Sequence, residues 1–121
     1  MANVTATKRL SDRVKPITVS ANLKLERYYQ SADQVLRQAQ IYRLGGDDET
    51  LYVLLLRYVS LVMETVPRHK DYRLQQHQSL HLEHKKKLPD LLDELERLKN
   101  SIDAKHAAAV AERTAPPADR N

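Results

Sequence analysis

The sequence predicts an all-α fold in which the helices pack as an antiparallel three-helix bundle. Apolar residues recur at three-and-four spacing over two long stretches, which is the period of an amphipathic helix. Glycine occurs only twice, and phenylalanine and tryptophan are absent, so a β-fold with many tight turns is disfavoured. The 121 residues, of which 41% are hydrophobic and 30% charged, suit one soluble domain with a single core.

Residues 1–22 are expected to form a basic N-terminal segment with a possible short amphipathic turn from Leu10 to Val14. Pro16 disfavours a long helix there, because its ring removes a backbone donor and clashes with the preceding turn. The segment has no apolar stretch of the kind found in secretory signals. We expect the bundle to span residues 23–112 and residues 113–121 to form a disordered tail.

The first long helix is predicted to follow, with about 18–20 residues. It should end at Gly45 and Gly46, because glycine readily takes the left-handed conformation that closes helices. Asp47 or Asp48 can then cap the next helix by accepting backbone N–H bonds, and so short a loop makes the two helices antiparallel. The apolar face of the first helix comprises Leu25, Tyr28, Tyr29, Ala32, Val35, Leu36, Ala39 and Tyr42.

The second helix, roughly residues 49–66, is predicted to be the centre of the bundle because it is apolar over most of its circumference. One polar stripe, within an arc of about 60°, holds Val53, Arg57, Ser60 and Glu64. A buried strand is the competing prediction, but the continuous length and the cap signals favour a helix. We expect no apolar run to be long enough for a membrane span. The opposite face holds Leu51, Leu55, Tyr58, Val62 and Val66.

A third helix is predicted after Pro67 and a connector at residues 68–72, and it should reach about Glu112. Its start is open: either Ser79 caps it and Pro89 kinks it, or Pro89 occupies its first turn. We favour the earlier start. Its apolar seam comprises Leu88, Leu91, Leu92, Leu95, Leu98 and Ile102.

Catalytic and metal-binding motifs are absent from the sequence, so neither an enzyme nor a cofactor is expected. There is no cysteine, no glycine-rich phosphate loop and no G-x-S-x-G or H-E-x-x-H motif. His77, His81 and His84 would share one face of a helix, and two of them have the spacing of some metal sites. Since no suitable carboxylate completes a set, a solvated helix start is the favoured interpretation.

A docking surface for an acidic helix is the functional hypothesis that the residues themselves allow. Arg57 and the run Lys85, Lys86 and Lys87 supply positive charge, although a merely solvated face remains an alternative for the run. Val53 with Leu56 and Leu61 could provide the apolar anchors that a helix in a groove needs. The net charge of +4 favours acidic partners but is too small for a dedicated nucleic-acid binder.

Two stretches carry a resemblance to a known family. One runs from Tyr28-Tyr29 through Leu36-Arg37-Gln38-Ala39 to Ile41-Tyr42-Arg43, and the other is LYVLLLRYVSLVMETVPRHKDY. The most specific part is the P-x-H-x-D-Y pattern from Pro67 to Tyr72. In their order and spacing these stretches resemble the N-terminal domain of the AMSH deubiquitinases. The sequence is also similar to the dimerisation domain of a ubiquitin-specific protease. The resemblance covers about residues 10–105 and implies an atypical MIT (microtubule interacting and transport) fold, with a short helical element before three bundle helices.

The resemblance further implies a cytoplasmic protein that docks the acidic helical C-terminal tails of ESCRT-III subunits and is thereby recruited to endosomal membranes. Polyubiquitin cleavage in that family belongs to a zinc JAMM domain, whose H-x-H motif does not occur in this chain. Reversing the charge of Arg57 or Lys86 should weaken docking. A homodimerisation module and a fragment of a linkage-specific JAMM deubiquitinase are the alternatives. The expected partner-binding residues are Val53, Leu56, Arg57, Ser60, Glu64, Lys85, Lys86 and Lys87.

Overall fold

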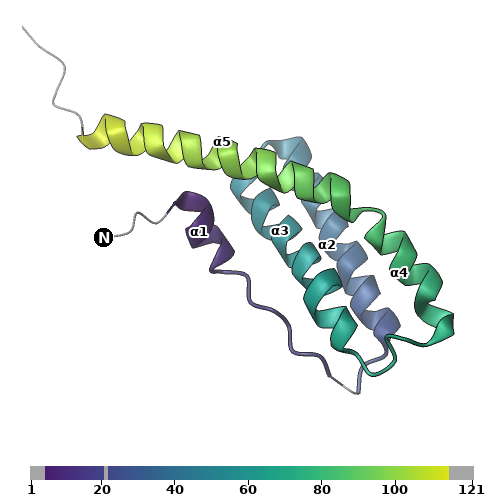
Figure 1. Ribbon diagram of the computed structural model, residues 1–121. Helices are drawn as coiled ribbons and strands as arrows, with labels where there is room; N and C mark the ends of the chain where they lie inside the picture. Colours follow the sequence, from purple (N-terminus) through teal and green to yellow (C-terminus); the bar gives the residue numbers. More distant parts are fainter. Residues whose placement is uncertain (1–4, 21, 115–121) are drawn as a thin grey trace, which may run out of the picture.

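The computed structural model describes residues 5–20 and 22–114, and every regular element within these ranges is helical, which confirms the predicted fold class. Figure 1 shows α2 and α3 side by side in opposite directions, while α4 and α5 follow each other across them. The elements in chain order are α1 (Ala6–Ser11), α2 (Leu25–Gly45), α3 (Asp48–Ser60), the π-helical turn η1 (Leu61–Thr65), the 3₁₀ turns η2 (Val66–Arg68) and η3 (Gln75–His77), α4 (Gln78–Lys85) and α5 (Leu88–Thr114).

The α2–α3 connection forms as the sequence predicts. Gly46 takes the left-handed conformation with a φ of 74°, and its N–H donates to the carbonyl of Arg43 at 3.4 Å. Asp47 caps α3, because its carboxylate accepts bonds from Thr50 N at 3.1 Å and from Thr50 Oγ1 at 2.8 Å. The same hydrogen bonds from Thr50 lower the pKa of Asp47.

Replacing Gly46 by alanine should lower the free energy of unfolding by about 1–2 kcal/mol, because a β-carbon is penalised in the left-handed conformation. Nothing lies within 4 Å of the position that the new Cβ would take, so no clash adds to this cost. Gly45 is the matched control: it has the same open surroundings but lies in α2 without a positive φ. Chemical denaturation should show that Gly45→Ala is neutral or stabilising, and equal losses in both variants would contradict the explanation.

α3 is the central helix, as its nearly all-round apolar sequence predicts. One core cluster packs the first part of α3 against α1 and α5 and includes Leu10 and Ile102. A second cluster packs α2 against the continuation of α3 and includes Leu25. The residues predicted to face away from the polar stripe are all at most 5% exposed, namely Leu51, Leu55, Tyr58, Val62 and Val66.

α3, η1 and η2 form one continuous helical stretch from Asp48 to Arg68. The stretch has 21 residues, and 18 consecutive residues within it have a mean hydropathy of 1.3, so by length and composition it could cross a membrane, and the expectation that no apolar run reaches that length is wrong. In the structure, 56% of this 18-residue part is buried inside the protein. The position of this helix at the centre of the bundle therefore accounts for its apolar character.

The N-terminal helix begins earlier than predicted. The sequence suggests a turn over residues 10–14, whereas α1 spans Ala6–Ser11 because the side chain of Thr5 caps it. Thr7 is only 2% exposed, and its backbone N and its Oγ1 both donate to Asp103 of α5 at 3.0 Å. Since Asp103 lies 96 positions away, local sequence patterns could not reveal the contact that fixes α1.

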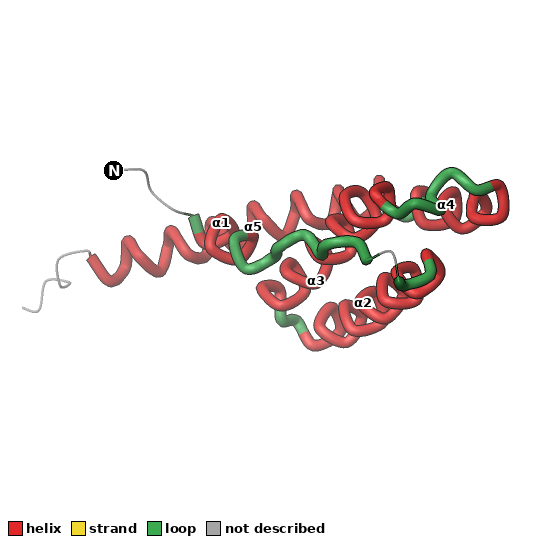
Figure 2. Tube along the Cα trace, turned by 90° about the horizontal axis from the view of Figure 1, so that it is seen from below, coloured by secondary structure: helices red, strands yellow, loops and turns green. Residues whose placement is uncertain are grey.

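Residues 13–20 form an extended segment, here called the strap, that leads from α1 back to α2 (Figure 2). Thr65 of η1 donates its hydroxyl to the carbonyl of Ile17 at 2.9 Å. Ser20 N donates to Tyr28 Oη of α2 at 2.7 Å. These two bonds hold the strap against α2 and the continuation of α3.

The predicted third helix is divided into α4 and α5. α4 begins at Gln78, close to the favoured start at Ser79, but it ends at Lys85 instead of continuing through a kink. A turn at residues 86–87 follows, and Pro89 lies in the first turn of α5, where its missing N–H costs nothing. Each of the two alternatives for the start of the third helix is thus confirmed in part: one helix begins near Ser79, and Pro89 occupies the first turn of another. The buried members of the predicted apolar seam are Leu95, Leu98 and Ile102.

Described helices lie on both sides of the stretch 23–112 that the sequence analysis assigns to the bundle. α1 contributes Leu10 to the core, so the N-terminal segment packs on the bundle expected for residues 23–112. α5 continues to Thr114, into the stretch expected to be a tail at 113–121. The rest of that expectation falls outside the described residues.

Candidate docking surfaces

The residues expected to bind a partner do not form one surface. Val53 is only 5% exposed and belongs to the core cluster that includes α1, so its side chain offers little surface to a partner. Arg57 and Glu64 are exposed, while Leu56 and Ser60 are partly buried. The periodicity of α3 alone could not show that α1 packs on its polar stripe.

One hollow, of about 600 Å³, lies between α3, the start of α5 and the strap, and we call it the α3–α5 hollow. Leu56 lines it, and so do the more exposed Met63 and Leu92, which are 53% and 43% exposed. Ser60 donates its hydroxyl to Glu64 Oε2 at 2.6 Å on the same wall. None of the described residues lining this hollow is positively charged. It is therefore apolar with one acidic side chain.

Two further hollows, of about 310 and 430 Å³, adjoin along the strap and together form what we call the strap groove. Both are lined by Ile17 of the strap, Ser31 of α2 and Leu61 of η1. No described residue that lines either hollow carries a carboxylate. The strap groove therefore combines an apolar floor with positive charge, supplied by Arg13, Lys15, Arg27 and Arg57.

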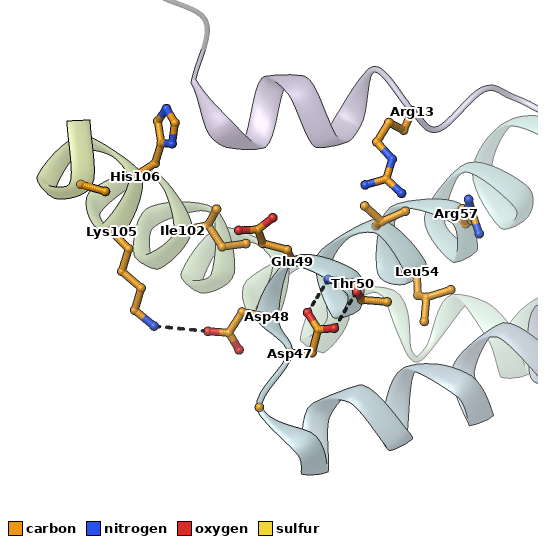
Figure 3. Close-up of a pocket in the computed structure, with 13 residues that line it drawn as sticks. Arg13, Asp47, Asp48, Glu49, Thr50, Leu54, Arg57, Ile102, Lys105 and His106 are labelled. Carbon is orange, nitrogen blue, oxygen red and sulfur yellow. Dashed lines mark hydrogen bonds and ion pairs between the residues drawn. The ribbon is translucent and has the colours of Figure 1, made fainter. Parts of the chain in front are cut away.

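A hollow of about 610 Å³ at the start of α3 is shown in Figure 3, and Arg13 and Arg57 line it as well as the strap groove. Its charges are more nearly balanced, because Asp48 and Glu49 also line it. Lys105 Nζ of α5 lies 3.7 Å from the carboxylate of Asp48. Because side chains of both charges line this hollow, it does not favour an acidic ligand.

The lysine run lies apart from Arg57 on the structure. Lys85 ends α4, with its Nζ 5.9 Å from the centre of the Tyr72 ring, and the other two lysines form the turn before α5. None of the three lines the strap groove, the α3–α5 hollow or the hollow of Figure 3. The fold therefore does not join the run to Arg57 in one groove.

The histidines of η3 and α4 are buried, so the expectation of a solvated helix start is wrong. Each of the three is at most 3% exposed. His81 Nε2 donates to the carbonyl of Tyr72 at 2.7 Å, and its Nδ1 bonds Tyr29 Oη of α2. His84 Nδ1 lies 2.8 Å from Tyr58 Oη of α3. We call the set of His81, His84, Tyr29, Tyr58 and Tyr72 the tyrosine–histidine cluster. Sequence reasoning missed it because the shared helical face was examined for metal ligands rather than for the core.

The tyrosine–histidine cluster favours the neutral forms of its imidazole and phenol groups. Burial is the main cause that lowers the pKa of His81 and of His84, although Asp33 opposes the shift at His84. Burial likewise raises the pKa of Tyr29 and Tyr58. Among the described residues, no group of three or more His, Cys, Asp or Glu side chains is placed to hold a metal ion. The cluster thus attaches α4 to α2 and α3.

Comparison with known proteins identifies the family. Residues 4–109 match the family model described as the USP8 dimerisation domain. AMSH-like ubiquitin thioesterase 3 of Arabidopsis thaliana is 42% identical over 90 residues, which make up 74% of this chain and 18% of that protein. STAM-binding protein of Mus musculus is 30% identical over 64 residues, or 53% of this chain and 15% of that protein. The chain thus spans less than a fifth of the length of these relatives. It belongs to the USP8 dimerisation domain family, in the form carried by the AMSH-family deubiquitinases.

Proposed function

We propose that this domain is a non-catalytic docking module that binds acidic helical tails of the ESCRT-III type in the strap groove. The observation that carries the proposal is the lining of that groove, where four cations and an apolar floor occur without a carboxylate among the described lining residues. An amphipathic helix needs apolar contacts for affinity, while its acidic residues gain steering and register from the surrounding cations.

Charge favours this groove over the other surfaces. The α3–α5 hollow is apolar but holds Glu64 and no described cation, so an acidic tail would meet repulsion there. Lys85, Lys86 and Lys87 offer charge, but none of them lines a hollow described above. Of the residues expected from the sequence to bind a partner, Arg57 and Ser60 line the strap groove.

Such docking would place a deubiquitinase where its substrates are sorted. Relatives of the chain are named ubiquitin thioesterases, and the chain matches at most 18% of their length. In a longer protein of this kind, we infer that cleavage belongs to another part and that this domain recruits the enzyme from the cytoplasm to endosomal membranes through its partners.

Arg57→Glu should weaken the binding of an acidic ESCRT-III tail peptide by up to about 30-fold. The change removes one attraction and adds one repulsion, each worth up to about 1 kcal/mol at an exposed site. Lys86→Glu is the matched control with the same change in charge, and it should leave the dissociation constant nearly unchanged. Fluorescence anisotropy titrations at two salt concentrations measure both effects, and circular dichroism checks that helix content is kept.

The pair of variants separates the possible sites. If Lys86→Glu weakens binding and Arg57→Glu does not, the lysine run is the site and the strap groove is not. If neither variant changes an observed affinity, the acidic residues of the tail do not contact either surface. Absence of binding by the unchanged protein would overturn the docking function itself.

Homodimerisation is a second candidate function, favoured by the description of the matching family as a dimerisation domain. The α3–α5 hollow, with Met63 and Leu92 about half exposed, is the apolar surface that a second copy would cover. Sedimentation equilibrium tests this candidate. A monomer mass that does not change with concentration would dispose of it.

A further inference from the structure

The end of the bundle where α2 begins carries a concentration of positive charge. The first residues of α2 and the loop after η2 lie together there, at the lower end of the molecule in Figure 1. We call residues 23–27 and 68–74 the basic end. It holds two carboxylates, Glu26 and Asp71, against five cations, so its net charge is +3 of the +4 of the whole chain. The cations are Lys24, Arg27, Arg68, Lys70 and Arg73.

These cations are free to meet an external partner. All five are exposed, and none of them forms an ion pair with another described residue. Elsewhere, by contrast, Arg43 pairs with Glu94 and Lys105 with Asp48. The positive charge of the basic end is therefore not compensated within the described part of the chain.

Two leucines project from the same end. Leu23 is 45% exposed and Leu74 is 46% exposed. Exposed leucines on adjacent loops, surrounded by cations, form a mixed apolar and basic surface. That composition is typical of surfaces that enter the interface of an anionic bilayer.

The two loops are fixed to each other by a buried histidine. His69 is only 4% exposed, and its Nε2 donates to the carbonyl of Leu23 at 2.7 Å. Its Nδ1 accepts a bond from Asp71 N at 3.0 Å, which shapes the loop that carries Leu74. Both leucines are thus presented by a preformed surface, which lowers the entropy lost on binding.

We propose that the basic end is a contact surface for a membrane rich in anionic lipids. The cations would be attracted to the negative surface potential, and Leu23 and Leu74 would enter the headgroup region. Leu74 is carried on a loop and lines none of the hollows described above, so it suits a flat bilayer better than a helical peptide, which needs a groove. Leu23 lies beside it at the edge of the strap groove. The basic end adjoins the strap groove and shares Leu23 and Arg27 with it. The proposal nevertheless does not depend on the docking of acidic tails.

Co-sedimentation with vesicles tests the proposal, using phosphatidylcholine alone and phosphatidylcholine mixed with phosphatidylserine. We expect binding only to the mixed vesicles, and we expect it to weaken as salt is raised. Each cation near such a surface contributes about fivefold to partitioning, so the triple variant R68Q/K70Q/R73Q should bind about 100-fold more weakly. Leu74→Asp should also weaken binding, because it places a charge where an apolar side chain would insert.

The control variant R37Q/R97Q/K99Q removes the same charge from exposed positions on α2 and α5. It should retain binding within about fivefold of the unchanged protein. Equal losses in the two triple variants would show only a general effect of net charge and would overturn the assignment. So would the absence of binding to phosphatidylserine vesicles, or undiminished binding of both Leu74→Asp and R68Q/K70Q/R73Q. Retention of tail-peptide binding by R68Q/K70Q/R73Q separates this surface from the strap groove.

Discussion

Acidification from pH 7 to pH 5 is expected to destabilise the bundle steeply, because His81 and His84 are buried as neutral imidazoles. The carbonyl of Tyr72 can only accept, so His81 Nε2 carries the proton and Nδ1 is the acceptor for the Tyr29 hydroxyl. A second proton on the ring would turn Nδ1 into a donor, and the Tyr29 hydroxyl would have to turn its own proton away to accept the bond. Protonation of His81 therefore costs desolvation and a rearrangement of this hydrogen bond.

His84 faces a more balanced environment. Tyr58 lies at its Nδ1, and Asp33 Oδ1 of α2 lies 3.6 Å from its Nε2. Lys87 and His81 oppose a positive charge on His84, while Asp33 and Glu83 favour it. Burial is the largest contribution and decides the direction, so the pKa of His84 lies below its ordinary value.

The sign of the pH effect follows from these lowered pKa values. The unfolded chain takes up protons on histidine below about pH 6.5, whereas the folded chain resists them. The contribution of the two histidines to the free energy of unfolding is therefore fully present above about pH 6.5. It falls as the pH drops below that value, until the pH reaches the pKa values of His81 and His84 in the folded chain. While both rings stay neutral, the loss is about 2.7 kcal/mol per pH unit, which is twice the value for one group.

Urea denaturation at several pH values between 7.5 and 5 measures this slope. A His81→Gln and His84→Gln double variant should be less stable at pH 7.5 but should lose much less stability on acidification. His106→Gln is the control, because His106 lies on α5 outside the tyrosine–histidine cluster and is only partly buried. A flat stability profile for the unchanged protein between pH 6.5 and 5 would show that the cluster accepts protons without cost.

Leu55→Ala is expected to lower the free energy of unfolding by about 2–5 kcal/mol, the range for deleting a buried leucine side chain. Leu55 lies on α3 with no exposed surface and belongs to the cluster that joins α3 to α1 and α5. A typical domain has only about 5–15 kcal/mol of stability, so this single change removes a large share of it.

Leu44→Ala is the matched control for that experiment. Leu44 is 78% exposed near the C-terminal end of α2, where loss of the side chain should change stability by no more than about 0.5 kcal/mol. Thermal or chemical denaturation compares the two variants directly. Similar small losses for both leucines would contradict the central position of α3.

The sequence allows the helices to be predicted because their causes are local. The glycine pair, the Asp47 cap and the apolar periodicity each act within a few residues, and all three hold in the structure. The break between α4 and α5 has a local cause too, but the sequence analysis expected one third helix and left its start open between Ser79 and Pro89. The all-round apolar character of α3 correctly indicated its burial.

The parts that escaped prediction depend on contacts between distant residues. α1 is held by Asp103, and the polar stripe of α3 holds the buried Val53 because α1 packs there. Arg57 and the lysine run share a charge but not a groove, and only the fold shows this. His81 and His84 have the spacing of a buried helix face, but their tyrosine partners lie on other helices. Sequence therefore indicates which residues carry positive charge but not which of them share a groove.

Backbone NMR of the labelled domain, titrated with an acidic ESCRT-III tail peptide, tests the location of docking most directly. If the tail lies in the strap groove, the largest shifts should appear at Ile17, Ser31, Arg57 and Leu61, with little change at Leu92 or Lys86. Saturation with shifts centred on Leu92 and Met63, or on the lysine run, would contradict the strap groove as the docking site.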